Sequence, residues 1–253
     1  MWLTRQTSFL YDAALALVYP ERCAVCEASV EKRFDGVACA MCWRATQLFS
    51  GEELLCAKCG AVLQNALPQS QKSRKIETQC RRCSDESFTA ARACGVYEKA
   101  LRASVLALKR KPYVAPRLAR MLRDAQRRAP LDTATRIMPV PLHRERERER
   151  SFNQAAMLGR ALAAQTNLVC DEWSLTRTLH TVRHRAGMDA SARRETVEGA
   201  FEVQRPRLIA GERILLIDDV FTTGATVSSC ASVLKAAGAD EVFVLTLARA
   251  GTS

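Results

Sequence analysis

Two helices are predicted between residues 97 and 128, where apolar positions recur every three or four residues. Pro112 separates them, because proline lacks the backbone N–H that a helix interior needs. Charged residues, mostly basic, fill the other faces. The inward positions are Leu101, Val105 and Leu108 in the first helix, and Leu118 and Leu122 in the second, which covers residues 115–128.

Short apolar runs then alternate with helical patterns to the end of the chain. Strands that alternate with helices indicate βαβ units and a parallel sheet, so the sequence predicts an α/β fold. Gly238 follows the last predicted helix, where a left-handed residue commonly ends a helix. The predicted strands are residues 137–140, 214–217 and 242–247, and the predicted helices are residues 154–166 and 225–237.

The first 90 residues show little apolar periodicity and contain four Cys-x-x-Cys pairs. Residues 1–20 resemble a signal peptide only superficially, because Asp12 interrupts the apolar stretch; we expect an amphipathic helix that ends at Pro20. Residues 69–75 are polar and predict an exposed loop. We therefore expect an N-terminal helix (1–20), a metal-organised module (21–90) and an α/β domain (91–253).

The composition is that of an ordinary globular protein, with 48% apolar and 26% charged residues among 253. No run of about 18 apolar residues is present, so we expect no transmembrane segment and a cytosolic location. The net charge of +11 favours polyanionic partners such as nucleic acid or nucleotide phosphates.

Eight of the eleven cysteines form the four pairs, which predict two structural zinc sites of four thiolates each. Redox dithiols or buried free cysteines are the alternative. Four pairs can combine in three ways, and we predict sequential pairing. The predicted ligands are Cys23, Cys26, Cys39 and Cys42 in one site, and Cys56, Cys59, Cys80 and Cys83 in the other. For Cys94, Cys170 and Cys230 we expect small buried side chains.

Residues 213–226, RILLIDDVFTTGAT, carry the strongest chemical pattern. An apolar strand ends in Asp218 and Asp219, whose carboxylates suit a sugar diol. A Thr- and Gly-rich loop follows and leads into a helix, and such a helix start binds anions through backbone N–H groups. The Gly-Lys-Ser/Thr ending of an ATPase loop is absent. An ordinary acidic strand end with a capping threonine is the alternative.

This segment resembles the phosphoribosyl pyrophosphate (PRPP) signature of type I phosphoribosyltransferases. The resemblance implies that fold, with Asp218 and Asp219 holding the ribose hydroxyls. It also implies a 5-phosphate cradle made by Thr222, Thr223, Gly224, Ala225 and Thr226.

A second resemblance covers nearly the whole chain and points to the ComF competence family. It includes the cysteine pairs, Leu108-Lys109, the segment Pro139-Val140-Pro141-Leu142, then Arg146, Arg150 and Phe152-Asn153-Gln154, and finally Arg193-Arg194-Glu195 and Phe201. The chain departs from the family pattern at Ser151, where glycine is usual, and at Arg185 and Thr196. Serine at position 151 carries strain if that backbone needs a positive φ.

Arginine and glutamate alternate over residues 144–150, a pattern that by itself is typical of a solvated surface. The family resemblance implies instead a mobile loop that closes over pyrophosphate, with Arg146 and Arg150 acting in catalysis beside Asp218 and Asp219. It also implies Mg2+ bound together with PRPP. Lys109 is a candidate phosphate contact, or a solvated lysine at a helix end.

Three functions remain open at this level. The chain is a phosphoribosyltransferase whose acceptor the sequence does not identify, a PRPP sensor without catalysis, or an accessory protein that handles single-stranded DNA. The zinc module and the two basic helices favour binding to single-stranded DNA. Aromatic side chains that could stack on bases are sparse, and Tyr97 and Tyr113 are weak candidates.

Overall fold

The computed structural model describes residues 21–63, 79–178 and 199–251. The expected N-terminal helix, the polar loop at residues 69–75, and the family positions Arg185, Arg193-Arg194-Glu195 and Thr196 lie outside the described residues.

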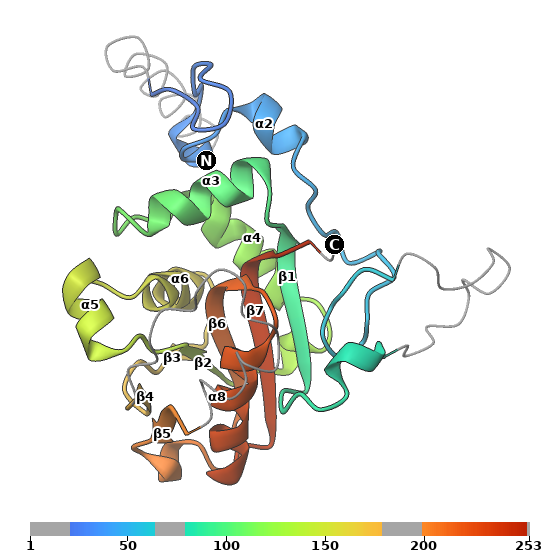
Figure 1. Cartoon of the computed structure of the whole chain (residues 1–253), viewed down its shortest axis with the longest axis vertical. Helices are drawn as coiled ribbons and strands as arrows, with labels where there is room; N and C mark the ends of the chain where they lie inside the picture. The colour runs from blue at the N-terminus through green and yellow to red at the C-terminus, as the bar shows by residue number, and fades with distance from the viewer. Residues whose placement is uncertain (1–20, 64–78, 179–198, 252–253) are drawn as a thin grey trace, which may run out of the picture.

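A five-stranded parallel sheet forms the centre of the α/β domain, as the sequence predicts (Figure 1). Its strand order is β1-β7-β6-β2-β3, and every neighbouring pair is parallel. The strands are β1 (Ala90–Val96), β2 (Arg136–Pro139), β3 (Val169–Cys170), β6 (Arg213–Phe221) and β7 (Glu241–Arg249).

Alternate residues of β6 point to opposite faces of the sheet, which creates two cores. Leu215 and Ile217 pack with the helices α3 (Lys99–Leu108), α4 (Pro116–Gln126) and α6 (Gln154–Ala163). Ile214 and Leu216 pack with α8 (Ala225–Ala236). Gly238 follows α8 with a φ of 93°, as predicted for a helix end. Helices therefore cover both faces of the sheet.

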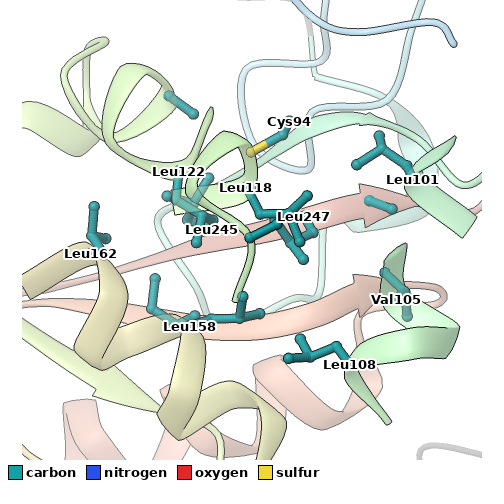
Figure 2. Close-up of a cluster of buried hydrophobic side chains, with 14 of the residues drawn as sticks. Cys94, Leu101, Val105, Leu108, Leu118, Leu122, Leu158, Leu162, Leu245 and Leu247 are labelled. Carbon is teal, nitrogen blue, oxygen red and sulfur yellow. The ribbon is translucent and has the colours of Figure 1, made fainter. Parts of the chain in front are cut away.

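Figure 2 shows the first core around Leu245 and Leu247 of β7. Leu101, Val105, Leu118 and Leu122 point into it, which confirms the predicted inward faces of the two basic helices.

Smaller elements lie around the sheet. An antiparallel hairpin joins β4 (Leu175–Arg177) to β5 (Phe201–Val203). In the described ranges, no helix is long and apolar enough to cross a membrane. The remaining elements are the helices α2 (Ala40–Arg44) and α5 (Arg144–Arg150) and the 3-10 helices η1 (Arg33–Asp35), η3 (Arg81–Cys83), η4 (Leu131–Thr133) and η5 (Pro206–Leu208).

The first cysteine-rich ribbon, which carries Cys23 to Cys42, and the second, which carries Cys56 to Cys83, pack into different cores. Cys23, Cys39 and Trp43 of the first ribbon belong to the core of α3 and α4, whereas Cys56, Cys59 and Cys83 of the second belong to the core of α8. Arg117 anchors the first ribbon, because its Nε donates to Asp35 at 2.7 Å and its guanidinium lies 4.8 Å from the Trp43 ring centroid. Each ribbon is therefore packed on the domain.

Two elements differ from the sequence expectation. The strand expected at residues 214–217 extends to Phe221, because its pairing with β7 continues through Asp218↔Thr246 to Phe221↔Arg249. Residues 144–150, expected by resemblance to form a loop, form α5, which His143 caps by accepting a hydrogen bond from the Glu145 N–H. The strands β1, β3, β4 and β5 were not predicted.

Candidate functional site

The loop between β6 and α8 is a tight turn that depends on Gly224. This residue has a φ of 89°, in the left-handed region that disfavours side chains. A Cβ at this position would lie 2.9 Å from Cζ of Phe221, which is too close. Thr223 Oγ1 accepts from the Ala225 N–H at 3.4 Å, at the first residue of α8. The turn therefore leads the loop directly into the N-terminus of α8, which is the positive end of the helix dipole.

The side chains of the loop range from exposed to half-buried. Thr222 is exposed, whereas Thr223 and Thr226 are half-buried, and the small residues Gly224 and Ala225 are buried. The structure thus brings the five predicted phosphate contacts together around one helix start. Such an arrangement of N–H and hydroxyl donors suits a phosphate group.

Asp218 and Asp219 lie at the carboxyl end of β6, next to this loop. Burial and the neighbouring Asp219 carboxylate raise the pKa of Asp218 to about 8, although the Asp219 N–H, which donates to Asp218 Oδ1 at 2.8 Å, and the charge of Lys109 oppose the shift. The Asp218 carboxyl is therefore mostly protonated near neutral pH and can donate as well as accept a hydrogen bond.

Lys109 also reaches the acidic pair. It is the C-cap residue of α3, and its Nζ lies 3.3 Å from Oδ2 of Asp219. Its side chain remains 35% exposed, so the ammonium group can still contact a ligand. Lys109 therefore sits at a helix end beside the acidic pair, and its contact with a phosphate stays a prediction.

The two arginines that match the family motif differ from their neighbours on α5. Arg146 and Arg150 are four positions apart, so they share one helix face, and both are half-buried. Arg150 Nη1 donates to Gln154 Oε1 at 3.0 Å. Glu145, Glu147, Arg148 and Glu149 are exposed. Ser151 has a φ of 64°, so serine carries there the strain that glycine avoids.

Arg177, at the end of β4, is a residue that the sequence analysis missed. Burial and the positive charge of Arg146 lower the pKa of Arg177, while the charges of Cys230 and Asp218 oppose this shift. Arg177 therefore lies within electrostatic range of both α5 and the acidic pair. Its guanidinium also packs 5.3 Å from the Phe201 ring centroid, across the β4–β5 hairpin. The short polar segment around Arg177 contains no motif that would identify it from the sequence.

The eight paired cysteines form two clusters, and the sequential pairing predicted from the sequence is confirmed. Within each cluster all four sulfurs lie within 4.8 Å of one another. Zn–S bonds of about 2.3 Å in a tetrahedron would place sulfurs roughly 3.8 Å apart; Cys26 and Cys39 are separated by 3.7 Å and Cys59 and Cys80 by 3.6 Å. The donor sets fit two structural Zn2+ ions with no open coordination position.

Backbone N–H groups support one sulfur in each cluster. Burial alone would raise the pKa of Cys23 and Cys56, but N–H donors, led by those of Cys39 and Cys80 respectively, lower both values to about 6. Such sulfurs are readily held as thiolates, the form that binds zinc.

The other three cysteines follow the expectation in two cases. Cys94 and Cys230 are buried, whereas Cys170 is half-buried.

The basic residues in α3 and α4, and those that directly follow each helix, divide into two groups. Arg117 holds the first ribbon, Arg128 Nη1 donates to the Phe49 carbonyl at 3.0 Å, and Arg123 pairs with Asp124 at 2.7 Å. Arg102, Arg110, Lys111, Arg120 and Arg127 are exposed. The exposed basic surface is therefore smaller than the sequence suggests.

Comparisons with known proteins agree with this organisation. A family model described as a double zinc ribbon domain matches residues 14–84. The chain is 30% identical over 241 residues to the DNA utilization protein YhgH of Escherichia coli K12, and the match covers 92% of this chain and 99% of that protein. It is 35% identical over 138 residues to competence protein F of Haemophilus influenzae, covering 53% of this chain and 60% of that protein.

A solved structure, the glutamine PRPP amidotransferase from B. subtilis complexed with ADP and GMP, is also similar. It shares 18% identity with a TM-score of 0.35, over 58% of this chain and 26% of that chain.

Proposed function

The chain belongs to the ComF family, with competence protein F and the DNA utilization protein YhgH, and from this premise we propose that it binds PRPP at residues 218–226. The observation that carries the proposal is the turn at Gly224, which places an anion-binding helix start beside two carboxyl groups. We further propose the division into an N-terminal helix (1–20), a double zinc ribbon (21–90) and a phosphoribosyltransferase-like domain (91–253), in a cytoplasmic protein.

Each part of PRPP has a counterpart in this site. The ribose hydroxyls are donors and acceptors, which Asp218 and Asp219 complement because one carboxyl is protonated near neutral pH. The 5-phosphate is an anion that the N–H groups and hydroxyls of Thr222, Thr223 and Thr226 can hold at the start of α8. Lys109 adds a positive charge beside Asp219.

The reaction proposed for this site is displacement of pyrophosphate from the anomeric carbon of the ribose. The C–O bond to pyrophosphate breaks first in such reactions, so positive charge develops on the sugar and negative charge on the leaving group. Arg146 and Arg150, on one face of α5, are the residues proposed to stabilise the leaving group. Mg2+, bound with PRPP near the carboxylates, would neutralise phosphate charge.

A PRPP sensor would use the same binding residues without the displacement step. Measuring pyrophosphate release from PRPP with a panel of nucleobases and amines distinguishes the two functions. Release that Arg146→Ala and Arg150→Ala reduce supports the enzyme, whereas binding with no release supports the sensor.

Single-stranded DNA is a second proposed ligand, on a different surface. Tyr113 is 61% exposed two residues after Lys111, and Arg110 and Arg127 are also exposed. An exposed aromatic side chain among cations provides both a stacking surface and phosphate contacts. The names of the relatives, which refer to DNA utilization and competence, support this proposal.

A thermal-shift measurement tests the binding of PRPP. PRPP with Mg2+ should raise the melting temperature of the protein, because a ligand that binds the native state stabilises it. The double variant Asp218→Ala with Asp219→Ala should lose this shift and keep its zinc. An unchanged shift in the double variant would place the site elsewhere.

A further inference from the structure

Arg249 connects the second cysteine cluster to the end of the sheet. It is the last residue of β7, where it lies opposite Phe221 of β6 and Val96 of β1. Its Nη1 donates to the carbonyl oxygen of Cys59 at 2.6 Å, and its Nη2 lies 3.7 Å from the Cys59 sulfur. A metal ligand and a central strand are therefore joined by one side chain.

The same guanidinium contacts the residue that supports the phosphate loop. The Arg249 Cζ atom lies 4.5 Å from the Phe221 ring centroid, a cation–π geometry. Phe221 is buried and meets Phe88 edge to face, with ring centroids 5.9 Å apart. A Cβ on Gly224 would come within 2.9 Å of its Cζ, so the ring packs against this turn. A continuous path of contacts thus runs from Cys59 to the turn that shapes the loop.

The segment after Cys83 makes a second connection to α8. The Ser87 N–H donates to Oγ of Ser228 in the first turn of the helix, at 2.8 Å. The Glu86 side chain lies 3.5 Å from the position that a Cβ on Gly224 would occupy. The segment that directly follows the second cluster therefore also contacts the phosphate loop and the start of α8.

The contacts of Arg249 with the second cluster depend on the charge of the metal site. Four thiolates around a divalent zinc ion leave a net charge of about −2, and Arg92 and Arg249 carry positive charges beside these sulfurs. Arg92 is also held by the carbonyl oxygen of Ala57 at 2.9 Å. Without the metal, we expect the turn that contains Cys56 and Cys59 to lose its fixed geometry. The Cys59 carbonyl would then no longer hold the guanidinium of Arg249.

The first cluster has a different neighbourhood. Its cysteines pack with α3 and α4, and its own anchoring arginine, Arg117, contacts Asp35 and Trp43. The two ribbons thus offer a matched pair of arginine anchors, one of which leads to the loop.

We propose that Arg249 is a positioning residue through which metal in the second cysteine cluster orders the phosphate loop, so that this cluster rather than the first sets the loop's affinity for phosphorylated ligand. The inference rests on the proposed function for the identity of that ligand, PRPP. The coupling is reciprocal, because any change in PRPP affinity caused by the metal implies an equal change in metal affinity caused by PRPP.

The experiment compares Arg249→Ala, Arg249→Lys and the control Arg117→Ala in the full-length zinc-loaded protein. PRPP affinity with Mg2+ should fall about tenfold in Arg249→Ala, within the usual range of coupling between sites. The PRPP affinity of Arg249→Lys should lie between that of Arg249→Ala and that of the wild type, because lysine keeps the positive charge but cannot stack a planar guanidinium on Phe221. Arg117→Ala should keep the wild-type affinity. Amide exchange should accelerate at residues 221–228 in Arg249→Ala and not in Arg117→Ala.

Zinc competition provides a separate readout. With a chelator at equilibrium, PRPP should protect one of the two zinc ions in the wild type and neither ion in Arg249→Ala. Equal protection of both ions, or equal loss of affinity in Arg249→Ala and Arg117→Ala, would overturn the inference.

The exchange measurement separates this inference from the proposed function. If the wild type binds no PRPP but the loop still exchanges faster in Arg249→Ala alone, the function is wrong and the structural coupling stands. If the wild type binds PRPP and Arg249→Ala changes neither affinity nor exchange, the coupling is wrong and the function stands.

Discussion

Lys109 and Asp219 form an ion pair of 3.3 Å between the end of α3 and the end of β6. The lysine offsets one acidic charge where a sugar phosphate is proposed to bind, and it remains exposed enough to contact that ligand. It thereby lowers the repulsion that two adjacent carboxylates would present to an anion.

Lys109→Met should weaken PRPP binding about fivefold, because a partly exposed ionic contact contributes roughly 1 kcal/mol. Calorimetric titration in the presence of Mg2+ measures this change. Arg110→Met, which removes an exposed cation at the next position, is the matched control and should bind as the wild type does. Equal affinities in the two variants would contradict the placement of Lys109 in the site.

Gly224→Ala should reduce PRPP affinity by tenfold or more, a loss of at least about 1.4 kcal/mol. The new Cβ would meet Phe221 at 2.9 Å in a backbone that already has a positive φ. Gly211→Ala is the control, because Gly211 has a φ of 75° and no atom within 4 Å of a Cβ. Both variants carry the backbone strain of roughly 1–2 kcal/mol, so the melting temperature of both should fall. PRPP affinity should fall in Gly224→Ala alone.

Asp218→Asn should stabilise the unliganded protein relative to the wild type as the pH rises from about 4 to about 8, while abolishing PRPP binding. The pKa of Asp218 in the folded protein, about 8, lies above its ordinary value. Its contribution to stability is therefore complete below about pH 4 and is lost as the pH rises through 8. Asparagine stays neutral, so the stability of the variant relative to the wild type should increase over this pH range.

Thermal unfolding between pH 5 and pH 8 tests this prediction. The difference in melting temperature should grow with pH and reach about 3 °C or more at pH 8, as ~1 kcal/mol would give in a chain of this size. A difference that stays constant over this range would mean that Asp218 does not titrate as described.

Single-stranded DNA binding should depend on the exposed cations that directly follow α3 and α4. The log-log slope of affinity against salt should be about −3 for the wild type, corresponding to roughly four neutralised phosphates. Removing Arg110, Lys111 and Arg127 together should flatten it to about −1. The control removes the exposed Arg205, Arg207 and Lys235, on η5 and α8, and should leave the slope unchanged. No binding at low salt in the wild type would remove the DNA function from this chain.

The sequence predicts the parts of the molecule whose chemistry is local. The cysteine spacing determines each knuckle, and the Asp-Asp and Thr-Thr-Gly segments lie within nine residues of one another, so both were recognisable before the fold was known. The pairing of the knuckles was a prediction that the sulfur positions confirm.

The parts that were missed depend on contacts between distant residues. Strand β1, Ala-Ala-Arg-Ala-Cys-Gly-Val, is poor in β-branched side chains and owes its structure to pairing with β7. Arg177 and Arg249 gain their roles only because a hairpin and a strand end bring them to the site. Their local sequence carries no motif.

Calorimetric titration of the zinc-loaded protein with PRPP and Mg2+ is a direct test of the PRPP site. We expect saturable binding of one PRPP per chain, lost in Asp218→Asn with Asp219→Asn and retained in Asp240→Asn with Glu241→Gln, an acidic pair at the opposite end of the sheet. Binding that survives in the first variant, or disappears equally in both, would contradict the assignment of residues 218–226 as the PRPP site.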